Sequence, residues 1–344
     1  MVIEFASKER LSVKDIMRKY RPNQIRCEML LGKIDIILME YFPESKGSFQ
    51  YIYNSKIVKD IGRGAFSYIQ SAVVSINFED TLVAVKTLTS PLDGMYSYTQ
   101  LSEARILSKL SKNHKNIMKM FGISLKKSGG KKFLQIYMEY CEESLSNLVL
   151  KRKKIKTKSC GNCKTLADRK DAWSFVTGIM EGLCSALNHV HSSGFVHRDL
   201  KLDNILVKGD HSVRLADFGL SKSEEDITGT IAGTPLYMAP EVMKGELYGS
   251  EADIYSLGMV LYELWYYRPV FTRPLLSNPS EYAPIFHTLK ELEDNVSKGC
   301  RPDCKIPVEP PFELKAVMEI CWDANKEKRP KAAEVYELIS KVKL

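Results

Sequence analysis

The chain has 344 residues and a mass of 39.1 kDa, enough to bury a sizeable core and to form two domains. Its 44% hydrophobic and 27% charged residues are ordinary for a soluble globular protein. No run of about 18 apolar residues is present, so we expect no membrane span. The charged residues within the first ten positions argue against a secretory signal.

Cysteine usage and charge bear on the compartment and the partners. The eight cysteines are scattered along the chain, which favours reduced thiols in the cytoplasm over a disulfide framework. Much of the net charge of +8 lies in residues 151–158. We interpret this stretch as a solvated basic loop; a nuclear-import signal or a docking site for an acidic partner are the alternatives. Direct binding to nucleic acid is not expected.

Residues 1–54 mix short helical patterns without recognisable chemistry, and from about Ser55 the pattern changes. Short apolar runs at 68–75, 82–86 and 133–138 predict strands. A helix is predicted between the second and third of these runs. Its apolar residues recur every three positions: Leu101, Ala104, Leu107 and Leu110.

After Cys141 the sequence becomes mainly helical. Apolar residues with helical spacing predict one buried helix around 175–190 and another around 254–265. We expect loop-rich insertions at 151–166 and at 273–311, the second marked by repeated prolines. A strand-rich first part and a larger helical second part predict two lobes with a cleft between them.

A glycine-rich turn follows the first predicted strand of the small lobe. Gly62 and Gly64 lack a Cβ, so their amides could approach phosphate oxygens closely. Ser67 stands where such loops often carry a third glycine, and it is still small. A G-x-G pattern alone is weak evidence, because a simple β-turn has the same sequence.

Lys86 ends a strand pattern, and alternation places Ala84 on the same face of the strand. A lysine in a strand is usually just an exposed charge. Glu103, however, lies in the next predicted helix and shares its inward face with Leu107. A buried Lys86–Glu103 pair would hold the ammonium in place, since an unpaired buried charge is costly.

Three motifs follow one another in the second half of the chain: HRDLKLDNIL at 197–206, DFG at 217–219 and GTPLYMAPE at 233–241. In this order they resemble the signatures of the eukaryotic protein kinase family, and the resemblance runs from about Ser55 to Val342. It implies an α+β fold with a small β-rich N lobe (55–140) and a larger helical C lobe (141–342). Residues 1–54 would be an extension of unknown role.

The resemblance implies transfer of the γ-phosphoryl group of Mg-ATP to protein hydroxyls. Asp199 would orient the substrate hydroxyl and accept its proton late, because a carboxylate with a pKa of about 4 is a weak base. Lys201 would balance charge at the γ-phosphate. Asn204 and Asp217 would offer oxygen ligands to Mg²⁺.

The resemblance also implies a nucleotide site in which Lys86 anchors phosphates. Met138 would guard the back of the pocket, and Glu139 to Cys141 would form the hinge. The remaining positions would surround the nucleotide: Ile61, Gly62, Gly64, Ser67, Ile69, Ala84, Glu103 and Leu206.

Further positions match structural features of the family. A stacked apolar column would contain Leu107, Met120, His197 and Phe218 and would be anchored at Asp253. Glu241 and Arg329 would form a buried ion pair.

Lys201 and the loop around Thr234 indicate serine/threonine rather than tyrosine specificity, with Thr234 expected to bond Asp199 and Lys201. Dual-specificity kinases share such features, so that alternative stays open. Cys321-Trp322 resembles the tyrosine-kinase-like branch of serine/threonine kinases. A pseudokinase scaffold and a small-molecule kinase are further alternatives, although no expected catalytic residue is missing.

A phosphorylation switch is predicted in the segment after the DFG motif. Arg198 and Lys222 are two cations placed to hold a phosphate, and Thr230 aligns best with the activation site of the family. The phosphate would come from an upstream kinase or from autophosphorylation.

Cys160 and Cys163 have the spacing of half a zinc site, which Cys300 and Cys304 could complete. We favour reduced surface thiols over a metal here, because nothing shows that the two pairs meet.

Overall fold

The computed structural model divides into two compact units, Met1–Cys141 and Glu142–Leu344. It describes residues 50–52, 55–64, 66–76, 79–92, 97–112, 114–159, 166–209, 212–275, 281–304 and 310–342. Most of the predicted extension, and the pair Cys160 and Cys163, lie outside the described residues.

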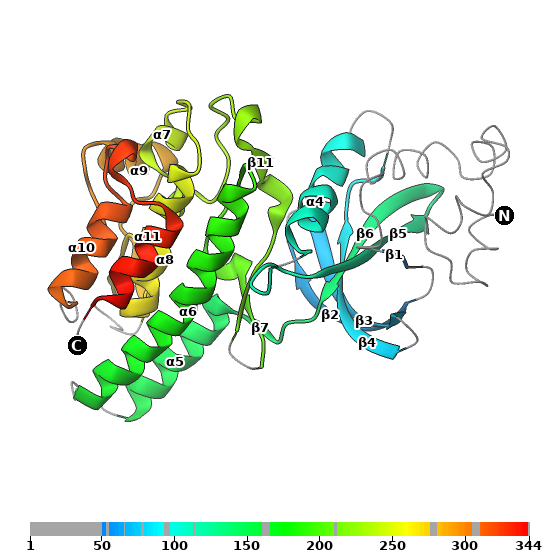
Figure 1. Ribbon diagram of the computed structural model, residues 1–344, viewed down its shortest axis with the longest axis horizontal. Coiled ribbons are helices and arrows are strands. Elements are labelled where there is room, and N and C mark those ends of the chain that lie inside the picture. Colours follow the sequence, from blue (N-terminus) through cyan, green and yellow to red (C-terminus); the bar gives the residue numbers. More distant parts are fainter. Residues whose placement is uncertain are drawn as a thin grey trace. The chain divides into compact units, whose positions relative to one another are not determined.

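The first unit contains a six-stranded sheet and one described helix, α4 (Ser97–Leu110) (Figure 1). The strands are β1 (Gln50–Tyr51), β2 (Lys56–Arg63), β3 (Ser67–Ile76), β4 (Glu79–Leu88), β5 (Met120–Ser128) and β6 (Lys131–Glu139). Their order across the sheet is β1-β5-β6-β4-β3-β2. All neighbours are antiparallel except β1 and β5, which are parallel.

The two faces of this sheet have different roles because side chains alternate along each strand. One face carries Val83, Val85 and Tyr137, which are buried in an apolar cluster together with Ile52. The opposite face carries Ala84 and Lys86, and Lys86 reaches Glu103 of helix α4. The outermost strand, β2, is exposed along its whole length.

The second unit is built mainly from helices (Figure 1). They are α5 (Leu145–Ser159), α6 (Leu166–Ser192), α7 (Pro240–Met243), α8 (Glu251–Tyr266), α9 (Leu289–Ser297), α10 (Phe312–Cys321) and α11 (Ala332–Ser340). Helix α6 packs against α8 and α11, and α10 packs against α8. Nearly every residue of α8 is buried, which explains its apolar sequence.

Short strands complete the second unit and carry its polar loops. They are β7 (Glu143–Ser144), β8 (Phe195–Val196), β9 (Ile205–Val207), β10 (Val213–Leu215), β11 (Lys222–Ser223), β12 (Thr272–Pro274) and β13 (Tyr282–Pro284). They form a sheet of order β10-β9-β7 and the two-stranded sheets β11-β8 and β12-β13.

The predicted α+β class is confirmed, and so are the predicted strands and helices named above. The two predicted loop insertions are wrong in part. Helix α5 continues through the basic stretch as far as Ser159, and the region 273–311 contains α9 and strand β13. Lysine and arginine are good helix formers, and the Arg152 and Lys153 cations lie over the rings of Phe175 and Tyr282.

Candidate active site

In the first unit, the predicted contact between Lys86 and Glu103 is present. The Lys86 ammonium lies 2.6 Å from a Glu103 carboxylate oxygen, and both side chains are buried. Strand β4 presents the lysine and helix α4 presents the glutamate. Each charge offsets the cost of burying the other, so the ammonium is held at a fixed position on this face of the sheet.

The glycine-rich turn joins β2 to β3. The Gly64 amide donates a hydrogen bond to the Ser67 carbonyl at 2.8 Å, which closes the turn. A Cβ at Gly62 or Gly64 would come no nearer than 3.9 Å or 3.6 Å to other atoms, an ordinary contact. The fold of the protein alone would therefore tolerate a side chain at either position. Glycine at both positions is consistent with a ligand that approaches the backbone closely.

Other predicted nucleotide residues of the first unit lie on or next to the Lys86 face. Ile69 pairs with Lys86, and Ala84 pairs with Met138 across the strands. The Glu139 carboxylate accepts a hydrogen bond from the Lys119 amide at 2.9 Å. Ile61 is exposed on β2.

Two further predicted nucleotide residues lie in different units. Cys141, which is half-buried, is the last residue of the first unit. Leu206 lies in strand β9 of the second unit, where it pairs with Ser144.

In the second unit, four predicted residues form one hydrogen-bonded cluster, which we call the Asp199 cluster: Asp199, Lys201, Asn204 and Thr234. The Lys201 ammonium donates to the Asp199 carboxylate at 2.8 Å and to the Thr234 hydroxyl at 2.7 Å. The Thr234 hydroxyl donates to the other Asp199 oxygen at 2.7 Å. The Asn204 amide donates to the Asp199 carboxylate at 2.9 Å. Asp199 is thus held in one orientation by three donors.

Backbone strain is present at two residues of the predicted motifs, one of them next to Asp199 in the chain. Arg198 and Asp217 adopt left-handed conformations with φ of 70° and 60°, which residues other than glycine rarely do. Such conformations cost roughly 1–3 kcal/mol and tend to occur at functional sites. Asp217 is exposed at the start of a short helical turn, Phe218–Leu220.

Asp253 of helix α8 holds the chain that precedes Asp199. Its two carboxylate oxygens accept hydrogen bonds from the amides of His197 and Arg198, each at 2.8 Å. Burial alone would raise the pKa of Asp253, but the hydrogen bond with His191 and the His197 amide hold the pKa below its usual value. The predicted anchoring role of Asp253 thus has a direct geometric basis, while the part played by His191 was not predicted.

The His197 ring also contacts the next predicted motif. It lies edge-on to the Phe218 ring, with 5.0 Å between the ring centroids. Leu107 and Met120, the other predicted members of this column, are buried in the first unit.

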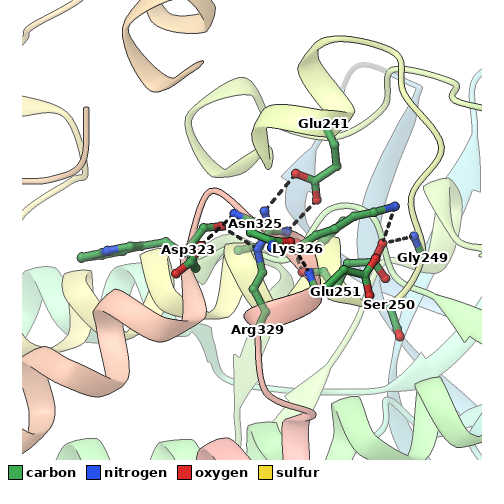
Figure 2. Close-up of polar contacts among 12 residues, drawn as sticks. Glu241, Gly249, Ser250, Glu251, Asp323, Asn325, Lys326 and Arg329 are labelled. Carbon is green, nitrogen blue, oxygen red and sulfur yellow. Dashed lines mark hydrogen bonds and ion pairs between the residues drawn. The ribbon is translucent and has the colours of Figure 1, made fainter. Parts of the chain in front are cut away.

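The predicted ion pair between Glu241 and Arg329 is also present (Figure 2). Two guanidinium nitrogens of Arg329 donate to the two Glu241 oxygens at 2.6 Å and 2.9 Å. Arg329 also donates to the main-chain carbonyls of Asp323 and Glu251. This contact joins the end of the loop that carries Thr234 to the chain before α11.

A hydrogen-bonded pair that the sequence did not predict, formed by the half-buried Tyr237 and the buried Glu263, supports the same loop. The Tyr237 hydroxyl donates to Glu263 of α8 at 2.7 Å, and the Val270 amide donates to the other oxygen at 3.0 Å. Burial raises the pKa of Glu263 to about 7, although both hydrogen bonds act in the opposite direction. Burial also raises the pKa of Tyr237, so its hydroxyl stays a donor. The sequence feature that could have pointed to this pair is an isolated glutamate within an otherwise apolar helix.

The predicted phosphate-binding residues also lie in the second unit. Arg198 donates to the Thr230 main-chain carbonyl at 3.1 Å, and the Thr230 side chain is exposed. Lys222 lies in strand β11, paired with Val196 of β8. The structure therefore brings Arg198 and Thr230 together.

The donor set fits the predicted cofactors. Asn204 and Asp217 supply an amide and a carboxylate, whose oxygens are the kind of ligand that Mg²⁺ prefers. The fixed Lys86 ammonium and the glycine-rich turn suit the phosphates of a nucleotide. Among the described residues, no group of three or more His, Cys, Asp or Glu could hold a metal. Cys300 and Cys304 are free thiols, but Cys304 is buried, so the predicted surface location is wrong for Cys304.

Comparison with known proteins agrees with this geometry. A sequence model described as "Protein kinase domain" matches residues 55–338. The chain therefore belongs to the protein kinase family.

Three relatives show the range of names within the family. The chain is 29% identical to a "Probable serine/threonine-protein kinase" of Dictyostelium discoideum, over 81% of the chain and 14% of that protein. It is 39% identical to a "Dual specificity protein kinase" of the same organism, over 41% of the chain and 26% of that protein. It is 30% identical to a "Tyrosine-protein kinase" of Girardia tigrina, over 80% of the chain and 51% of that protein. The chain thus spans only part of the length of each relative. No described helix is long and apolar enough to span a membrane.

Proposed function

We propose that this chain is an ATP-dependent protein kinase that transfers the γ-phosphoryl group of ATP to serine and threonine hydroxyls of proteins. The observation that carries the proposal is the Asp199 cluster, in which Lys201, Asn204 and Thr234 all donate to one carboxylate. A carboxylate fixed in this way can orient an incoming hydroxyl toward a phosphoryl group.

Each chemical role falls to a residue of the chain. Asp199 accepts the hydrogen bond of the substrate hydroxyl and takes its proton late in the transfer. Lys201 places a positive charge where negative charge moves during the reaction. Lys86 would hold phosphates of the nucleotide, and Asn204 and Asp217 would hold Mg²⁺. When bound, Mg²⁺ neutralises charge on the phosphates.

Threonine at position 234 supports serine/threonine specificity, because its hydroxyl bridges Asp199 and Lys201. This specificity is tested by incubating a generic protein substrate with ATP that carries a labelled γ-phosphate and then identifying the phosphorylated amino acids. Phosphoserine and phosphothreonine alone would support it, and additional phosphotyrosine would show dual specificity. No transfer under any condition would favour a scaffold without catalytic activity.

Glu103→Gln should lower kcat/KM for ATP by about 10-fold to 100-fold. A hydrogen bond between charged groups, worth about 1.5–3 kcal/mol, would be weakened, and the Lys86 ammonium would lose its fixed position. Steady-state kinetics at varied ATP concentration measures the effect. Glu79→Gln, an exposed site on the same strand as Lys86, is the matched control and should behave as wild type. An unchanged kcat/KM in Glu103→Gln would refute the assigned role of the pair.

Phosphorylation of Thr230 should raise activity, because a phosphate of about −1.5 to −2 charge would attract Arg198 and Lys222. Thr230→Ala should lose this increase, and Thr228→Ala, an exposed threonine two positions earlier, should retain it. Rates before and after phosphatase treatment measure the difference. Thr230→Ala with an undiminished rate would argue against this switch. The phosphate would come from an upstream kinase or from autophosphorylation.

We also propose that the enzyme acts in the cytoplasm.

A further inference from the structure

The segment Asp217–Glu241, which we call the activation segment, contacts one neighbouring loop at several points. This loop, residues 244–250, joins α7 to α8, and we call it the α7–α8 loop. Three separate contacts connect the two, through Tyr248, Gly245 and Ser250. None of them needs a phosphate.

The first contact centres on the buried hydroxyl of Tyr248. This hydroxyl accepts a hydrogen bond from Arg198 Nε at 2.8 Å and donates one to the Thr230 carbonyl at 2.8 Å. Burial raises the pKa of Tyr248, so the hydroxyl keeps the proton that it donates. Only 5% of Tyr248 is exposed, and the Arg198 guanidinium carbon lies 5.7 Å from the centre of its ring.

Arg198 itself faces main-chain acceptors. Besides Tyr248, its guanidinium donates to the carbonyls of Leu220 at 3.2 Å and of Thr230 at 3.1 Å. The cation therefore joins both arms of the activation segment, one near its start and one near its middle. Since Tyr248 fixes Nε, the two remaining nitrogens can point at these carbonyls.

The second contact is a close approach of two backbones. Gly229 has φ of +77°, and a Cβ there would lie 2.3 Å from the Gly245 carbonyl oxygen. A side chain at this position would displace the activation segment from the loop. Glycine at 229 therefore permits the approach that places the Thr230 carbonyl against Tyr248.

The third contact lies nearer the start of the activation segment. A Glu224 oxygen accepts a hydrogen bond from the Ser250 amide at 2.9 Å, next to the N-terminus of α8. A carboxylate is favoured at this end of a helix. The Glu224 amide in turn donates to the Gly194 carbonyl at 3.0 Å.

The α7–α8 loop is itself held in place (Figure 2). The Gly249 amide donates to Glu251 at 2.8 Å, and the Lys326 ammonium donates to the Leu247 carbonyl at 2.8 Å. The Lys326 ammonium also lies 3.4 Å from a Glu251 oxygen. The loop can therefore act as a support for the activation segment.

We propose that the α7–α8 loop is a clamp that holds the activation segment in its substrate-binding arrangement without a phosphate, with Tyr248 as the positioning residue. The inference rests on the proposed kinase function and adds its regulation. It predicts basal transfer to protein substrates by the unphosphorylated enzyme. A phosphate on Thr230 would then add to this activity rather than create it.

Tyr248→Phe tests the clamp, because it removes both hydrogen bonds and keeps the ring. Tyr255→Phe is the matched control: Tyr255 is a buried tyrosine of α8 whose hydroxyl has no hydrogen-bond partner among the described residues. All forms are full chains treated with phosphatase, with the absence of phosphate verified by mass spectrometry. Tyr248→Phe should lower kcat/KM for a protein substrate by about 10-fold to 100-fold, through loss of a hydrogen bond to a charged group. KM for ATP should change little, and Tyr255→Phe should match wild type.

Hydrogen exchange supplies a readout that does not depend on activity. Amides of residues 227–233 should exchange faster in Tyr248→Phe than in Tyr255→Phe, with equal Tm. If Tyr248→Phe folds poorly, Glu224→Ala is a second test variant, because the Glu224 side chain is exposed. It should speed the exchange of the amides of residues 221–227. Equal hydrogen exchange in the variants and the control would overturn the clamp. The clamp would also be overturned if the phosphorylated wild type were active and the unphosphorylated wild type inactive. If neither form transfers phosphate, the proposed function fails, and the exchange comparison still decides whether the clamp exists.

Discussion

Replacing Asp199 with asparagine should lower kcat by about 10²-fold to 10⁴-fold, the usual contribution of a positioned acid–base group. The variant keeps the shape of the side chain, but it loses the charge that Lys201 and Thr234 orient and that would receive the substrate proton. Transfer of labelled phosphate to a protein substrate under saturating ATP measures the loss. KM for ATP should change little, because no nucleotide contact is assigned to Asp199.

A neighbouring aspartate provides the control for this experiment. Asp203 lies on the same loop, is exposed, and has no role in the proposed chemistry. Asp203→Asn therefore makes the same chemical change four positions away and should retain nearly full activity. Equal rates for Asp199→Asn and wild type would mean that the Asp199 cluster is not the site of transfer.

Arg329→Ala should lower the free energy of unfolding of the second unit by about 3–5 kcal/mol, the cost of breaking a buried ion pair from one side. The Glu241 carboxylate would stay buried without its two donors, and the main-chain carbonyls of Asp323 and Glu251 would lose theirs (Figure 2). Denaturant unfolding followed by tryptophan fluorescence measures this difference, since Trp322 lies near this contact in the chain.

Two variants make the stability result specific to the ion pair. Lys328→Ala removes an exposed cation next to Arg329 and should change stability by less than about 0.5 kcal/mol. The double variant Glu241→Gln, Arg329→Ala should be more stable than Arg329→Ala alone, because no unpaired charge remains buried. If Arg329→Ala unfolds at the same denaturant concentration as wild type, the pair does not stabilise the unit.

Much of the candidate site could be predicted because its residues lie at fixed intervals within short motifs. The contact of Lys86 with Glu103, that of Glu241 with Arg329, and the two hydrogen bonds of Thr234 are all present in the structure. The strand and helix patterns already suggested the contact of Lys86 with Glu103, whereas the resemblance to a family supplied the other pairings. The roles of these residues in ATP binding and transfer stay predictions until they are tested.

The unpredicted features depend on tertiary packing between residues without a local pattern. Tyr248 and the pair of Tyr237 with Glu263 gain their roles from neighbours distant in sequence. The basic stretch after Leu150 was predicted as a loop because a run of like charges resembles one. The stretch is helical, and its Arg152 and Lys153 cations pack on aromatic rings. Sequence periodicity does not reveal such packing.

The exposed outer strand β2 has a consequence for the behaviour of the protein in concentrated solution. No described strand pairs with the outer side of β2, and Ile57, Val58 and Ile61 are exposed, so this edge could pair with the same edge of another molecule. Lys56, Lys59 and Arg63 lie along this edge, and their mutual repulsion opposes such pairing. We therefore expect the cations of β2 to oppose self-association at low ionic strength, and this effect should weaken as salt screens their charge.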